Sequence, residues 1–132
     1  MKKVVVDTNV FVSGIFWGGK PHLVLKSWKL GQYKLVVSPE ILTEYRRVLE
    51  DVSKNYPAIE IDSFFELIEL NCVLVNAKPL RGICKDPDDD KFIAAALAGG
   101  ADFIVSGDKA LLDVETYQGV QIMNPSNLLK RL

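Results

Sequence analysis

The sequence has little histidine and little cysteine: of 132 residues, His22 is the one histidine, and Cys72 and Cys84 are the two cysteines. A zinc site built from imidazole and thiolate ligands needs more of them than one copy of this chain carries. A Ser-His-Asp or Cys-His catalytic group would depend on His22, and nothing near it in the sequence resembles such a site. Two cysteines also do not make a disulfide framework. If the protein is an enzyme, carboxylates are therefore its expected working groups.

Strong charge of one sign and long hydrophobic runs are also lacking. The sequence has 16 Lys and Arg residues against 17 Asp and Glu residues, a formal net charge of −1, which argues against a basic nucleic-acid arm or an acidic tail. No apolar run approaches the ~20 residues of a membrane span, and the start of the chain lacks a secretion signal, so we expect a cytoplasmic protein. With 132 residues, 48% of them hydrophobic, the chain is expected to form a single domain over 1–132.

Short apolar runs alternate with segments of helical periodicity. A polar break is expected at 7–9, and helices after Pro21, after Ser38, before the third strand, over 86–98, around 110–113 and at the end of the chain. The five expected strands lie at 3–6, 35–37, 72–75, 103–105 and 120–123. These runs do not alternate between apolar and polar residues, so both faces of each strand are expected to be buried. The pattern predicts a parallel sheet with helices on both faces.

Acidic residues follow several of these expected strands. Asp7 comes directly after the first strand, Asp108 follows the fourth, and Glu44 lies in the helix that the second strand feeds. The acidic segment 86–90 begins a further helix at the same edge of the sheet. Because ligands of open α/β sheets bind beyond the carboxyl ends of the strands, we expect these acids to meet in one place. A turn or cap would also account for Asp7 and Asp108, and a solvated helix face for Glu44.

The segment 86–90 has a structural explanation as well as a functional one. Asp86 is a good N-cap, and Asp88 and Asp89 are favourable at the positive end of the helix dipole. Asp90 lies three residues before Ile93 on the core-facing stripe, where an unpaired carboxylate is costly. Asp89 fits that face almost as well, so periodicity alone does not choose between these two acids.

Several carboxylates at one edge of a sheet require a counter-charge. Without one they repel each other, and each raises the pKa of the others. A bound divalent cation removes this conflict, and ligands that are all oxygen suit Mg²⁺ or Mn²⁺ rather than zinc or copper. One or two such ions can polarise a phosphoryl oxygen, activate water and stabilise the leaving oxygen. The acidic residues therefore favour metal-assisted phosphate chemistry.

Four segments resemble the motifs of PIN-domain ribonucleases, in the order and spacing of that family and over nearly the whole chain. The segments are VVVDTNVFVS at 4–13, SPEILTE at 38–44, DPDDDKFIA at 86–94 and FIVSGD at 103–108. The likeness is greatest to the branch of toxin components of prokaryotic toxin–antitoxin systems. The resemblance implies a three-layer α/β/α sandwich with a five-stranded parallel sheet.

The resemblance also implies which residues act. The catalytic and metal-binding acids that it implies are Asp7, Glu44, Asp90 and Asp108. The polar residues that it places in support of the metal, which would be Mg²⁺ or Mn²⁺, are Thr8, Asn9 and Ser106. The family pattern has its third acid three residues before an apolar pair that matches Ile93 and Ala94, and it therefore favours Asp90 over Asp89.

The implied reaction is hydrolysis of phosphodiester bonds in RNA by a metal-dependent endoribonuclease. Such a substrate needs cations to hold its phosphates, and several basic residues lie near the acidic motifs. The candidates are Arg46, Arg81, Lys85 and Lys91. The resemblance further implies an antitoxin protein as a partner and self-association into a homodimer or higher oligomer.

Two other classes of function remain open on the sequence alone. A phosphatase of the aspartyl-phosphate kind also has an acid at the end of its first strand, but such enzymes resemble Asp-x-Asp there, and Asn9 cannot serve as the second acid. A non-catalytic module that binds RNA or protein is the other alternative, although acids at the phosphate-binding edge would repel RNA unless a metal lay between them. The absence of a Gly-x-Gly-x-x-Gly segment after the first strand argues against a dinucleotide-binding enzyme.

Overall fold

The structure, a computed structural model, describes residues 1–132 as strands that alternate with helices. The strands are β1 (Lys3–Val6), β2 (Lys34–Val37), β3 (Cys72–Leu74), β4 (Phe103–Val105), β5 (Thr116–Tyr117) and β6 (Val120–Met123). The helices are α1 (Thr8–Phe16), α2 (Gly19–Lys29), α3 (Pro39–Ser53), α4 (Asp62–Leu70), α5 (Asp90–Gly99), α6 (Lys109–Leu112) and α7 (Pro125–Arg131), and a 3₁₀ turn, η1 (Pro87–Asp89), precedes α5. None of these helices has the length and apolar character needed to cross a membrane.

The strands form one mostly parallel sheet in the order β3-β2-β1-β4-β6-β5. In the centre of the sheet Val4 is paired with Phe103, and Val6 with Val105. The sheet has six strands rather than the five expected, because β5 pairs antiparallel to β6 at one edge. The turn between them, Gln118-Gly119, has positive φ at both residues, which is typical of a tight hairpin. A strand of two residues is too short to produce an apolar pattern in the sequence.

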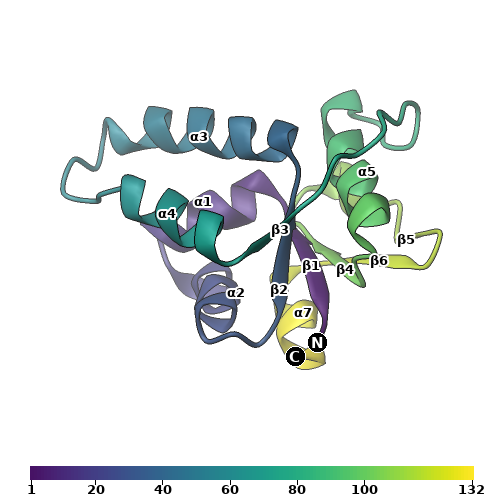
Figure 1. Ribbon diagram of the computed structural model, residues 1–132, viewed down its shortest axis with the longest axis horizontal. Helices are drawn as coiled ribbons and strands as arrows, with labels where there is room; N and C mark the ends of the chain where they lie inside the picture. The colour runs from purple at the N-terminus through teal and green to yellow at the C-terminus, as the bar shows by residue number, and fades with distance from the viewer.

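Helices cover both faces of the sheet, as the alternation of elements predicts. The helix α5 covers one face, where it packs against β1, β2 and β4. The helix α7 packs against β4 and against α2. Figure 1 shows α1 to α4 on the opposite side of β1 and β2 from α5. The three valines of β1, Val4, Val5 and Val6, are fully buried because both layers cover this central strand, and this explains its uninterrupted apolar sequence.

The first helix begins one residue after β1, where the sequence pattern indicates only a polar break. The backbone N–H of Asp7 donates to the Val105 carbonyl at 2.9 Å, so Asp7 still belongs to the sheet edge, and α1 starts at Thr8. Valines and a glycine give α1 a low helix propensity, and packing determines its position. Gly14 lies so close to α2 that a Cβ atom there would come within 2.8 Å of Leu25. This short connection fixes Asp7 at the carboxyl end of β1.

Tyr45 of α3 ties this helix to the end of β1. Its side chain is fully buried, stacks on Phe11 at a centroid distance of 4.4 Å, and donates a hydrogen bond from its hydroxyl to the Val6 carbonyl. We expect Tyr45→Phe to lower the free energy of unfolding by about 1–2 kcal/mol, because a buried carbonyl loses its partner. Urea unfolding measures this change. Tyr56→Phe, which removes an exposed hydroxyl, is the matched control. Equal decreases in the free energy of unfolding of the two variants would contradict the role given to Tyr45.

Candidate active site

The carboxyl ends of β1, β2 and β4 lie side by side at one edge of the sheet. Asp7 follows β1 directly, Asp108 lies three residues beyond the end of β4, and Glu44 is in the second turn of α3, which β2 feeds. The charges of Asp108 and Glu44 both raise the pKa of Asp7. These three predicted acids therefore lie close enough to influence one another.

Asp7 is the most enclosed of these three acids. Its side chain is 4% exposed and makes no capping hydrogen bond to α1. Instead, Ser106 Oγ donates to Asp7 Oδ2 at 2.7 Å, and the same Ser106 oxygen accepts the backbone N–H of Asp108 at 2.9 Å. Burial raises the pKa of Asp7 above its usual value, and the hydrogen bond from Ser106 acts in the opposite direction. Ser106 thus orients Asp7, and its support of a metal remains a prediction.

Glu44 connects three helices through its two carboxylate oxygens. Thr8 Oγ1 of α1 donates to Glu44 Oε2, and Lys91 Nζ of α5 lies 2.6 Å from Glu44 Oε1. Arg47, on the same helix as Glu44, approaches Oε1 only to 4.0 Å. Glu44 is therefore held in a fixed position between α1, α3 and α5, and is not a solvated surface acid.

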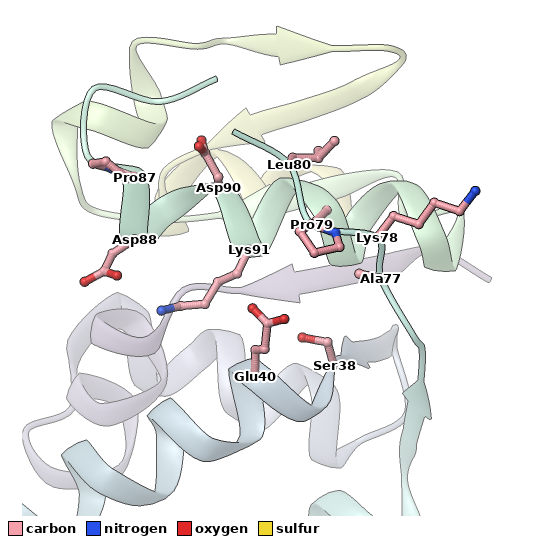
Figure 2. A pocket seen from close by; sticks show the side chains of 11 residues that line it. Ser38, Glu40, Ala77, Lys78, Pro79, Leu80, Pro87, Asp88, Asp90 and Lys91 are labelled. Carbon is pink, nitrogen blue, oxygen red and sulfur yellow. The ribbon is translucent and has the colours of Figure 1, made fainter. Parts of the chain in front are cut away.

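The two neighbouring acids that the sequence leaves open are placed differently. Asp90 is 3% exposed, and its Oδ1 accepts the backbone N–H of Cys84 at 2.7 Å. Figure 2 shows that Asp90 and Lys91 leave α5 on opposite sides. Asp90 thus holds the loop before η1 against the start of α5. One of its two carboxylate oxygens is used in this structural contact.

Asp89 interacts with the other acids of the site. It is 8% exposed, and its buried Oδ2 has no hydrogen-bond donor. Burial, a hydrogen bond with Asp108 and the negative charges of Asp108, Asp7 and Asp86 together raise the pKa of Asp89 to about 7. Asp89 lies in a 3₁₀ turn capped by Asp86, and such a turn has three residues per turn, so helical periodicity does not choose between Asp89 and Asp90.

The remaining predicted residues differ in their surroundings. Asn9 is exposed, whereas Thr8 is buried. Arg46 packs over the ring of Phe65 at 4.0 Å and so faces α4 rather than α5. Arg81 is exposed on the loop that follows β3, and further along this loop Lys85 lies 3.9 Å from Asp113. Asp108 also accepts the backbone N–H of Ala110 at 3.2 Å and so caps α6, as the structural explanation of this acid expects.

The donor set is suited to a metal ion by its chemistry, although the side chains are not gathered around one point. No group of three or more His, Cys, Asp or Glu side chains is close enough together to hold a metal ion. The acids are held by separate partners, as in the Ser106 bond to Asp7 and the Lys91 bond to Glu44. The unpartnered Oδ2 of Asp89, among carboxylates that raise its pKa, is an atom that a cation would satisfy. Oxygen-only donors fit a hard divalent cation.

A pocket of ≈ 140 Å³ adjoins these acids. It lies between the start of α3, the loop after β3 and the start of α5 (Figure 2). Its charged side chains are Glu40, Lys78, Asp88, Asp90 and Lys91. The pocket is lined by Asp90 and Lys91, which directly follow Asp89 in the chain.

The raised pKa values of Asp89 and Asp7 have a consequence for stability. Asp89 titrates at about 7 in the folded protein against an ordinary value of 3.8, so between these values the folded state binds more protons than the unfolded state. The free energy of unfolding of the metal-free protein is therefore expected to fall as pH rises from about 4 to about 7. Urea unfolding with a chelator across this range measures the slope. Asp89→Asn should flatten it, and an unchanged slope in that variant would contradict the assignment.

Comparisons with known proteins agree with this fold. A family model described as PIN domain matches residues 3–110 of the chain. This range contains β1 to β4 and the acids Asp7, Glu44, Asp89 and Asp108. An uncharacterized protein of Methanocaldococcus jannaschii is 33% identical over 118 residues, which cover 85% of this chain and 74% of that protein.

Proposed function

The chain belongs to the PIN-domain family, and from that premise we propose that it is a metal-dependent endoribonuclease. A PIN domain has a nuclease-like fold, and the acids that follow β1 and β4 at the carboxyl edge of this sheet support the proposal. The observation that carries the proposal is that Asp7 and Asp108, from distant parts of the chain, lie at the carboxyl ends of neighbouring parallel strands and are joined through Ser106. Carboxylates in this arrangement favour a bound cation.

In this proposal Asp7, Glu44, Asp89 and Asp108 hold Mg²⁺ or Mn²⁺. When bound, the ion polarises a phosphoryl oxygen and lowers the pKa of water. Asp89 takes the third position that the motif resemblance assigns to Asp90, since Asp90 is held by the Cys84 amide.

The chain's own residues prepare this chemistry by orientation and by proton affinity. Ser106 fixes the Asp7 carboxylate, and Thr8 fixes that of Glu44, so neither acid has to be ordered when substrate arrives. Without a bound cation, Asp89, whose pKa is about 7, holds or releases a proton near neutral pH, and a cation at Oδ2 would take the place of that proton. The near-burial of Asp7 and Asp89 limits the access of bulk water to their carboxylates.

The proposed substrate is single-stranded or structured RNA that runs along this edge. Arg81 and Lys85, both exposed on the loop after β3, are proposed phosphate contacts. The likeness of the motif segments to the toxin branch supports a further part of the proposal, that an antitoxin protein is a partner and that the chain forms a homodimer or higher oligomer. The M. jannaschii relative carries no assigned activity and does not add to this part.

A cleavage assay on a panel of structured RNAs tests the proposal. We expect cleavage with Mn²⁺ or Mg²⁺, none with excess chelator, and recovery when the metal is restored. Cleavage that persists in chelator would refute the metal dependence. Chelator-insensitive RNA binding with no cleavage under any metal would support a binding module. A covalent phosphate on Asp7 would support a phosphatase.

A further inference from the structure

We propose that Lys91 is the resident counter-ion of the acidic site and competes with the divalent cation for Glu44. The inference rests on the proposed function, because it concerns how this chain receives its metal. It assigns Lys91 a role other than contact with substrate phosphates, and it makes Lys91 a positioning residue for metal entry.

The geometry of the ion pair sets it apart from the other salt bridges of the protein. Lys91 Nζ lies 2.6 Å from Glu44 Oε1, and both side chains are 16% exposed. In every other salt bridge of the structure at least one side chain is mostly exposed. An ion pair enclosed to this degree is screened little by solvent. Lys91 is therefore the cation placed to neutralise Glu44 in the absence of metal.

Both oxygens of Glu44 are already engaged. Thr8 donates to Oε2 and Lys91 donates to Oε1. A divalent cation that binds Glu44 directly must therefore share an oxygen with one of these donors or displace it. If the ion instead binds the neighbouring acids Asp7 and Asp108, the Lys91 ammonium remains as a positive charge close to it. In both cases the charge of Lys91 opposes metal binding.

The structure also provides acceptors for the displaced ammonium. Lys91 lines the same pocket as Glu40 and Asp88 (Figure 2), and neither of these carboxylates forms a salt bridge elsewhere in the structure. The four-carbon stem of lysine can move its charge without movement of the backbone. Lys91 can therefore leave Glu44 for the pocket while α5 stays in place.

Calorimetric titration of the metal-free protein with MnCl₂, without RNA, tests the proposal. We expect Lys91→Met to bind Mn²⁺ at least about tenfold more tightly than wild type, because a like charge has been removed beside a divalent ion. If the methionine variant fails to fold, Lys91→Gln, which keeps a polar end, replaces it and should also bind Mn²⁺ more tightly than wild type. Lys91→Arg, which keeps the charge, and Arg47→Met, which removes an exposed charge from the same carboxylate, should each stay within about threefold of wild type.

Thermal unfolding gives an independent readout. Without metal, Lys91→Met should have a lower Tm than wild type, and saturating Mn²⁺ should close the gap. A lower Tm together with unchanged or weaker Mn²⁺ affinity would mean that the pair is only structural, and would overturn the proposal. If wild type cleaves RNA with Mn²⁺ while Lys91→Met shows no gain in affinity, only this inference fails. If neither protein binds Mn²⁺, both the inference and the proposed function fail.

Discussion

Asp7→Asn is expected to reduce metal-dependent RNA cleavage about a thousandfold, a loss of ~4 kcal/mol of transition-state stabilisation. The substitution removes the charge of the most enclosed acid of the site but keeps its shape. Ser106 can still donate to the amide oxygen of asparagine, so the hydrogen bond that orients the side chain is retained. The free energy of unfolding should not fall, because a buried charge beside Asp108 and Glu44 is removed.

Single-turnover cleavage with Mn²⁺ measures this effect, together with urea unfolding of the same samples. Asp102→Asn is the matched control, because Asp102 lies at the end of β1 opposite to Asp7. Its carboxylate accepts the backbone N–H of Lys3 at 3.0 Å. Cleavage by this variant should be equal to that of wild type. A wild-type rate in Asp7→Asn would contradict the site assignment, and equal losses in both variants would indicate a general effect on the sheet.

Asp89→Asn and Asp90→Asn are expected to fail in different ways. Asp89→Asn should lose cleavage about a hundredfold or more and keep its stability, because it removes an acid whose Oδ2 has no partner in the fold. Asp90→Asn should lose about 1–2 kcal/mol of stability, because a charged acceptor of the buried Cys84 N–H becomes neutral. Its cleavage rate per folded molecule should remain close to that of wild type.

The two variants are to be compared under conditions in which both are folded, as judged by their urea curves. Cleavage rates are then normalised to the folded fraction. The reverse pattern, with loss of cleavage in Asp90→Asn and normal cleavage in Asp89→Asn, would restore the assignment that the motif resemblance favours. Equal losses in the two variants would mean that the segment acts as one unit.

The convergence of Asp7, Glu44 and Asp108 was accessible from the sequence because parallel strands end at a common edge. Apolar runs locate the strands, and the first polar residue after each run marks that edge. The family model over residues 3–110 and the mostly parallel sheet confirm the predicted family and α/β fold. The roles of these acids in metal binding remain predictions.

Other features depend on contacts that no local pattern contains. The helix α1 is held by its close approach to α2 rather than by the propensity of its residues. The different surroundings of Asp89 and Asp90 follow from a 3₁₀ turn and from a loop amide that lies six residues before Asp90. The Lys91–Glu44 pair joins residues 47 positions apart in sequence. Alternation and spacing of residue types do not encode such pairings.

The most direct test of the account is the position of a bound metal ion. Crystals of the wild-type protein grown or soaked with MnCl₂ and measured at the manganese absorption edge would locate it by anomalous scattering. We predict a peak within coordination distance of Asp7 and of at least one of Asp89 and Asp108, and no such peak in Asp7→Asn crystals. A peak bound to Asp90 without Asp89, a peak elsewhere, or no peak at saturating Mn²⁺ would contradict it.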